Sequence, residues 1–183
     1  MGPATPGSFS SRRDWQWIGY NHCMREDGAL EDLNAVKYLY LWHLSEPSDN
    51  ALRIVVQEAV ENRSAGVRPT SLELPELAEI LKDSWPIETT EGCKTFEIYW
   101  KSYAAYLVCE EMFGSVATGR HEDEVFTGRM LRVYSKSHFL DYFGAWPLEP
   151  IQHYRLLCLN HLIDVAAYAP PEIRVIAAPT QRT

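Results

Sequence analysis

Short segments in which apolar and polar residues alternate recur along this chain of 183 residues. In the clearest of them, Phe96, Ile98 and Trp100 alternate with Glu97 and Tyr99. Because successive side chains of a β-strand point to opposite faces, this segment predicts a strand that is buried on one face only. Strands of that kind are typical of antiparallel sheets, in which one face meets the core and the other meets water.

The same reading predicts further strands and two short helices. Turn residues at 46–50 join two strands into a hairpin, and Lys101-Ser102 joins two more. Helical spacing predicts a helix over 71–85, and Ser137 is an N-cap for a second helix. The result is an α+β fold dominated by antiparallel sheet. Its predicted strands are 15–20, 37–44, 51–60, 96–100, 103–113 and 129–136. The segment 154–168 fits either a helix or two strands that meet at Asn160-His161, and the turn-forming Asn160 favours the strands.

Length and composition indicate one domain with a substantial core. An apolar fraction of 46% excludes global disorder, and a domain of this size buries roughly 70% of its unfolded surface. The segment 1–13 is rich in Gly, Pro and Ser, so we expect a flexible N-terminal tail, a single domain over 14–175 and a flexible tail over 176–183.

The charge of the chain narrows the classes of partner. Asp and Glu outnumber Lys and Arg by 25 to 17, which gives a net charge of −8. Nucleic-acid binders normally carry a basic patch and a high pI, so we expect no nucleic-acid partner; a basic protein suits this charge better. The sequence shows no secretory signal or membrane span, and the cysteines read as reduced buried thiols, so a cytoplasmic location follows. These cysteines are Cys23, Cys93, Cys109 and Cys158.

A basic and aromatic row is the best candidate site for an anion or a partner. In the strand-like stretch 129–138, Leu131 and Val133 are expected to face the core while the row faces outward. The alternative is a solvated face whose charges pair with Glu97, Glu110 or Glu111 on adjacent strands. Because Ser137 begins a helix, the last member of the row belongs to the helix start. The row consists of Arg132, Tyr134, Lys136 and His138.

Other combinations of reactive residues carry less weight. Ser135, Ser137, His138 and Asp141 include every triad residue type, but their closeness in sequence favours helix capping over catalysis. His161 and Asp164 form a polar pair of uncertain role. The two side chains share a face if the segment is a helix, and they lie on opposite faces if it is a strand.

Two further sets of residues are candidates for metal binding and for acid–base catalysis. The residues His153 and Cys158, taken with His161 and Asp164, do not complete a zinc pattern, so we predict no metal and no cofactor. We interpret Glu97, Glu110 and Glu111 as solvent-exposed residues of a sheet face rather than as an acid–base pair.

Aromatic side chains on predicted strands are candidate contact residues. Tyr and Trp dominate the energetic centres of protein interfaces, although most such rings in a sheet pack in the core. The candidates are Tyr99, Tyr103 and Tyr106.

Several short motifs between Phe96 and Ile173 resemble a set of small uncharacterised bacterial proteins. They are Phe96-Glu97-Ile98 with Tyr103 and Tyr106, Ser137-x-Phe139-Leu140-Asp141-Tyr142, and His153-Tyr154 followed by Asn160–Val165. The resemblance implies a bacterial cytosolic protein, and it implies no activity, cofactor or catalytic residue.

The sequence therefore predicts a non-catalytic cytosolic protein-binding domain, one form of which is an immunity-type inhibitor of a basic bacterial toxin. The alternative is a small enzyme or binding protein for an anionic ligand that bears a phosphate or a nucleotide, with the basic row as its site. The oligomeric state is left open.

Overall fold

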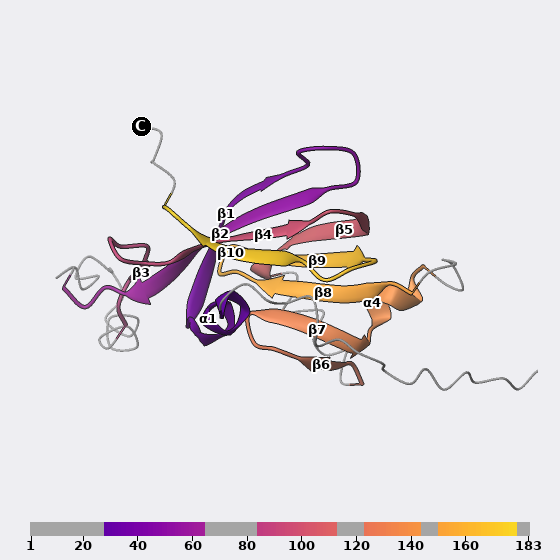
Figure 1. The fold of residues 1–183 in the computed structure, drawn as a ribbon. Helices are drawn as coiled ribbons and strands as arrows, with labels where there is room; N and C mark the ends of the chain where they lie inside the picture. The colour runs from indigo at the N-terminus through magenta and orange to yellow at the C-terminus, as the bar shows by residue number, and fades with distance from the viewer. Residues whose placement is uncertain (1–27, 65–83, 113–122, 144–149, 179–183) are drawn as a thin grey trace, which may run out of the picture.

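A computed structural model describes residues 28–64, 84–112, 123–143 and 150–178. These residues form two antiparallel β-sheets and two short helices (Figure 1). The mainly antiparallel architecture predicted from the sequence is confirmed. The predicted strand over 15–20, the predicted tail over 1–13, residues 71–83 of the predicted helix over 71–85 and residues 179–183 of the predicted tail over 176–183 lie outside the described residues. Ile176 is the last residue of a strand.

The first sheet has the strand order β1-β2-β4-β10, and β3 pairs with β2. The predicted hairpin around residues 46–50 is confirmed, because β1 and β2 pair antiparallel from Tyr38↔Ala59 to Ser45↔Arg53. Within the turn, Asn50 adopts a positive φ of 59°, a conformation that Asn tolerates better than most residues. The strands are β1 (Tyr38–Ser45), β2 (Leu52–Glu61), β3 (Ile87–Glu88), β4 (Thr95–Trp100) and β10 (Glu172–Ile176).

The second sheet has the strand order β5-β9-β8-β7-β6, and these strands follow one another down the view in Figure 1. The expected pair of strands that meet at Asn160-His161 is confirmed as the β8–β9 hairpin. In the β6–β7 turn, Gly128 has a φ of 86°, and a Cβ there would lie 2.1 Å from the carbonyl oxygen of Leu131, so the turn requires glycine. The strands are β5 (Tyr103–Glu110), β6 (Val125–Thr127), β7 (Leu131–Lys136), β8 (Gln152–Leu157) and β9 (His161–Ala167).

The hydrophobic core lies between the two sheets and takes side chains from both. Phe96, Ile98 and Trp100 of β4 are fully buried, as the alternation predicted. Across the interface, the ring of Tyr154 on β8 meets the indole of Trp100 edge to face, with centroids 5.7 Å apart. The inward direction predicted for two β7 residues is also confirmed, because Leu131 is buried and Val133 packs against the core.

Helix α1 (Ala29–Ala35) joins the two sheets at one side of the core. It contacts β10 of the first sheet, and Leu33 is its fully buried residue. The side-chain oxygen of Asn34 accepts hydrogen bonds from the backbone N–H groups of Arg129, Met130 and Leu131, at 2.8, 2.8 and 3.2 Å. One amide thereby satisfies three donors where β7 begins.

The second predicted hairpin is wrong. The strands β4 and β5 are consecutive in the chain, but β4 pairs with β2 and β10 whereas β5 pairs with β9. The Lys101-Ser102 step carries the chain from one sheet to the other. The step lacks the Asn-Gly or Gly residues that close a two-residue hairpin. Strand β4 already has a neighbour on each side, β2 and β10, so β5 pairs in the other sheet.

Among the described residues, no helix is long and apolar enough to cross a lipid bilayer.

Candidate functional site

A layer of stacked rings and charged groups crosses the outer face of the second sheet. The ring of Phe126 on β6 lies 5.2 Å from that of Tyr134 on β7, and Tyr134 stacks on His153 of β8 at 4.2 Å. Arg155 on β8 and Asp164 on β9 extend this layer. In the strand register, Tyr134 pairs with His153, and Arg155 pairs with Asp164. We call these five residues the outer-face layer.

The polar end of the layer is an ion pair between buried Asp164 and half-buried Arg155. The Arg155 guanidinium donates to both carboxylate oxygens of Asp164, from Nε at 2.6 Å and from an Nη at 3.3 Å. Burial opposes ionisation of Asp164, but the hydrogen bonds from His153 and Arg155 outweigh it and hold the pKa of the carboxyl below its usual value. The carboxylate is therefore charged at neutral pH.

The middle of the layer connects this ion pair to helix α4 (His138–Asp141). His153 is fully buried; its Nε2 lies 2.8 Å from Asp164 Oδ1, and its Nδ1 lies 2.7 Å from Ser137 Oγ. The Ser137 oxygen also accepts the backbone N–H of Leu140, which confirms the predicted N-cap. An imidazole protonated at Nε2 satisfies all of these groups.

This serine–histidine–carboxylate chain has the order of a hydrolytic triad. Its serine, however, is buried and caps α4, and the ring of Phe139 covers His153 at 4.9 Å. The groups are therefore engaged in seating α4 on the sheet. Of the four residues considered from the sequence as a triad (Ser135, Ser137, His138 and Asp141), only Ser137 takes part in this hydrogen-bonded chain. The four residues therefore do not form a triad.

The structure divides the predicted basic row between the layer and its exposed border. Tyr134 is buried in the layer, and the Arg132 guanidinium lies over the Phe126 ring at 4.3 Å. Lys136 and His138 both bind Asp123, at 2.5 and 2.6 Å. The row thus has two different environments rather than one exposed stripe.

Asp123 is the central residue of the exposed border of the layer, where it binds both Lys136 and His138. Hydrogen bonds from Lys136 and His138 lower the pKa of its carboxyl strongly. The hydrogen bond to Asp123 also raises the pKa of His138, which lies 3.1 Å from Asp141 as well. Glu124 accepts the backbone N–H of His138 at 2.9 Å, so two successive acidic residues hold the start of α4.

The acids predicted to pair with the row are wrong. Glu97 binds Arg53 within the first sheet at 2.5 Å. Glu110 lies on β5, at the opposite edge of the second sheet from β6, and Glu111 directly follows it. The strands beside β7 are β6 and β8, so the acids that reach the row come from residues next to β6 and from α4.

Large apolar side chains directly follow the acids of this border in the chain. Val125 and Phe126 of β6 are 54% and 41% exposed, and Tyr142, just after α4, is 86% exposed. We call the surface formed by Asp123, Val125, Phe126, Lys136, His138 and Tyr142 the α4 corner. It combines exposed rings with charges that are already held in place.

The remaining predicted site residues lie elsewhere. Tyr99 of β4 is half-buried and pairs in register with Arg53 and Glu172 of the first sheet. Tyr103 and Tyr106 of β5 meet edge to face at 5.2 Å, and the Tyr106 hydroxyl donates to Glu46 at 2.8 Å.

The pair His161 and Asp164 is not brought together. In strand β9 these two residues fall on opposite faces, and the partners of Asp164 are His153 and Arg155.

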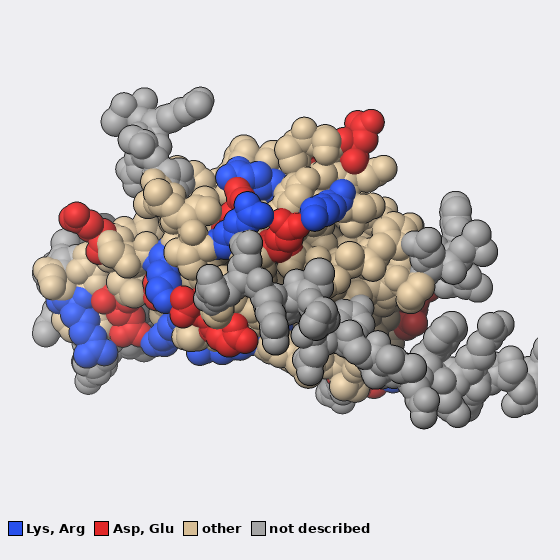
Figure 2. Space-filling view, in the orientation of Figure 1, with Lys and Arg blue, Asp and Glu red and all other residues tan. Residues whose placement is uncertain are grey.

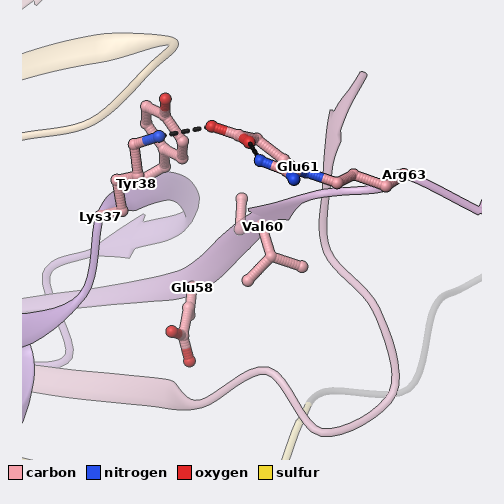
Figure 3. Close-up of a pocket in the computed structure, with 7 residues that line it drawn as sticks. Lys37, Tyr38, Glu58, Val60, Glu61 and Arg63 are labelled. Atoms are coloured by element: carbon pink, nitrogen blue, oxygen red, sulfur yellow. Dashed lines mark hydrogen bonds and ion pairs between the residues drawn. The ribbon is translucent and has the colours of Figure 1, made fainter. Parts of the chain in front are cut away.

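A small pocket of about 240 Å³ lies at the far end of the first sheet (Figure 3). Glu61 occupies one side of it, where it binds both Lys37 and Arg63. Glu58 adds a second carboxylate to the lining. The acids therefore balance the cations, and the pocket has no excess positive charge that would attract an anion.

Within the part of the chain that the structure describes, no group of three or more His, Cys, Asp or Glu side chains is arranged to hold a metal ion. The described cysteines are free; Cys158 is buried, which raises the pKa of its thiol to about 12, whereas Cys93 and Cys109 are half-buried. Burial and a high pKa make the Cys158 thiol a packing group rather than a nucleophile.

Sequence reasoning missed the links from His153 to Asp164 and from Arg155 to Asp164. The alternation within β8 was visible, since His153 and Arg155 alternate with Tyr154 and Leu156. It indicates a polar face on a central strand, and such a face needs buried partners. Only the register of β8 against β9 identifies Asp164 as that partner.

The fold and the site together define a two-sheet antiparallel β-protein with an aromatic and charged surface on the outer face of its second sheet. Comparison with models of protein families, with curated proteins and with solved structures gives no match.

Proposed function

We propose that this chain is a non-catalytic protein-binding domain and that the α4 corner is its contact surface. The observation that carries the proposal is the exposure of Val125, Phe126 and Tyr142 around a set of fixed charges. Exposed apolar residues that cluster in this way mark interaction sites more often than scattered ones do.

The corner is organised before any partner arrives. Phe126 is held between Arg132 and Tyr134, and Tyr134 is in turn stacked on His153. A side chain that is already ordered loses little conformational entropy on binding, so more of its contact energy appears as affinity. Aromatic and Arg residues are also the types that most often dominate binding energy.

The charge balance favours a basic partner. The net charge is −8, and Figure 2 shows Lys and Arg interspersed with Asp and Glu on the visible face rather than gathered in a basic patch. Most described cations already contact a carboxylate, which leaves the excess acids to set the long-range field. These cations are Lys37, Arg53, Arg63, Lys94, Lys101, Lys136, Arg155 and Arg174.

An acidic cytoplasmic inhibitor that covers a basic toxin, as immunity proteins do, is one concrete form of this proposal. Complementary charge would speed the encounter between the two proteins, and the aromatic corner would supply the tightly packed contact. The anionic-ligand alternative receives less support, because Lys136 and His138 are engaged by Asp123 and Arg132 by the Phe126 ring.

Affinity capture with matched baits tests this function. The wild-type protein, the double variant Phe126→Ala/Tyr142→Ala and the control Trp42→Ala are each used to capture proteins from a lysate of the cells that produce the chain. Trp42 lies on β1 of the first sheet and is 41% exposed, so its removal is a comparable change away from the corner.

We expect the wild type and Trp42→Ala to retain one stoichiometric protein rich in Lys and Arg, and the double variant to lose it. Each truncated anchor typically costs about 1–2 kcal/mol or more of binding energy. Absence of any stoichiometric partner, or equal capture by all three baits, would refute the proposal.

A further inference from the structure

The β1–β2 turn places a carboxylate against two tyrosines of β5. The Tyr106 hydroxyl donates to Glu46 Oε1 at 2.8 Å, and the ring of Tyr103 meets that of Tyr106 edge to face, with centroids 5.2 Å apart. Glu46 is exposed, and both tyrosines are half-buried. We call these three residues the tyrosine–carboxylate site.

The backbone fixes this arrangement on both sides. The bulge between Tyr103 and Ala105 adds one residue to β5, so Tyr103 and Tyr106, three positions apart, both pack against the core. The Tyr103 N–H donates to the carbonyl oxygen of Asn50 at 2.9 Å, which ties the turn to the start of β5. The site is therefore formed before any ligand arrives.

The negative charge of Glu46 is not balanced within the described part of the chain. There, no Lys, Arg or His side chain binds its carboxylate, whose hydrogen-bond partner is the neutral Tyr106 hydroxyl. Arg53, which lies opposite the residue before Glu46 in the strand register, is bound to Glu97. The hydrogen bond to Glu46 raises the pKa of Tyr106, and burial raises that of Tyr103, so both hydroxyls stay neutral donors.

We propose that the tyrosine–carboxylate site binds one lysine or arginine side chain of the basic partner. The inference rests on the proposed function, because it names a group that this partner contributes. A carboxylate supplies the counter-charge and the hydrogen-bond acceptors for such a cation. The negative faces of tyrosine rings attract the same cation.

The position of the site favours the partner of the α4 corner as the source of the cation. The β1–β2 turn and α4 lie at the same end of the molecule, on the right of Figure 1. Four strand spacings of about 4.8 Å separate β5 from β6, or roughly 20 Å, and an interface of about 800 Å² per protein spans such a distance. Tyr168, which follows the intervening strand β9, is 42% exposed and adds an aromatic contact between the two.

Nuclear magnetic resonance of the tyrosine rings tests the site without the partner. The probes are a blocked tripeptide with a central lysine and the same tripeptide with norleucine, which lacks only the ammonium group. We expect saturable shifts of the Tyr103 and Tyr106 ring signals with the lysine peptide and none with the norleucine peptide. Each signal is assigned by its loss in the corresponding Tyr→Phe variant.

Two matched variants separate the site from the general field of the turn. Glu46→Gln removes the charge but keeps an oxygen that accepts the Tyr106 hydroxyl, and we expect it to raise the dissociation constant of the lysine peptide about fivefold or more. Asp49→Asn removes an equal charge from the same turn and should change the constant less than about twofold. Circular dichroism confirms that both variants are folded.

The same variants extend the affinity capture that tests the α4 corner. Glu46→Gln should weaken retention of the basic protein, and Asp49→Asn should not. Ring signals that do not respond, an equal response to both peptides, or equal losses in the two variants overturn this proposal. A captured partner with unresponsive rings refutes only the cation site, whereas responsive rings without a captured partner refute only the proposed function.

Discussion

At the scale of single residues, Asp164 is the most constrained carboxylate of the outer-face layer. It receives hydrogen bonds from His153 and from Arg155; it is buried together with His153, whereas Arg155 is half-buried. A buried ion pair adds little net stability compared with an apolar pair, but removal of one partner leaves the other charge unsatisfied. Asp164 therefore matters mainly because Arg155 and His153 depend on it.

We expect Asp164→Asn to lower the free energy of unfolding by about 2–4 kcal/mol, because the half-buried Arg155 guanidinium loses its counter-charge and the buried His153 loses its acceptor. Urea unfolding measures the change. Asp49→Asn, the same substitution in the exposed β1–β2 turn, should change the value by no more than about 0.5 kcal/mol. Equal effects of the two substitutions would show that the ion pair is dispensable.

At the scale of elements, short helix α4 is held by side chains at its start rather than by its own length. Helices this short are unstable alone. Ser137 caps it, Glu124 binds its first N–H, and His138 binds Asp123 and Asp141. The attachment of α4 therefore depends on the charge of His138.

This attachment predicts a pH dependence. The pKa of His138 is raised above its ordinary 6.5, so its stabilising effect is complete below pH 6.5 and is lost as the pH rises through the raised pKa. The pKa of Asp123 is lowered below its ordinary 3.8, so its effect is complete above pH 3.8 and is lost at lower pH. The difference in melting temperature between wild type and His138→Gln should be largest between these two values.

Melting curves of the two proteins, recorded from acid to alkaline pH, measure this difference. His43→Gln, a change at an exposed histidine of β1, serves as the control and should show no comparable trend. A difference between wild type and His138→Gln that does not shrink at alkaline pH contradicts the assignment.

At the scale of the whole molecule, the two sheets share one hydrophobic core. Trp100 of the first sheet and Tyr154 of the second meet inside it, and the buried cluster includes residues of both sheets and of α1. Neither sheet buries its inner face without the other. The sheets should therefore unfold together.

We expect Trp100→Ala to lower the free energy of unfolding by about 3–5 kcal/mol through the cavity that it leaves. Far-UV circular dichroism and tryptophan fluorescence should report the same midpoint in urea, for the wild type and for the variant. Trp42→Ala, at an exposed position of β1, should shift the midpoint far less. Two separate transitions would mean that the sheets fold independently.

Much of the fold could be predicted from local patterns. The spans of β1, β2, β4 and β7, the turn near Asn50, the cap at Ser137 and the inward direction of Leu131 follow from periodicity and turn chemistry. Periodicity fitted both a helix and strands over 154–168, and the turn residues at Asn160-His161 favoured the two strands that the structure has. The site could be predicted in part only. Tyr134 and Arg132 were identified, but the role of Tyr134 as a buried stacking residue was not, because burial depends on what α4 and β8 place above it.

What the sequence alone determined is most of the longer strands and the core-facing residues of β4 and β7, since alternation is a property of neighbouring residues. What only the tertiary structure decided is which strands lie side by side. Strand pairing depends on competition among all strands for neighbours and for a shared core, and no local pattern records that outcome. For this reason β4 and β5 separate into two sheets, and Asp164 meets His153 and Arg155 rather than His161.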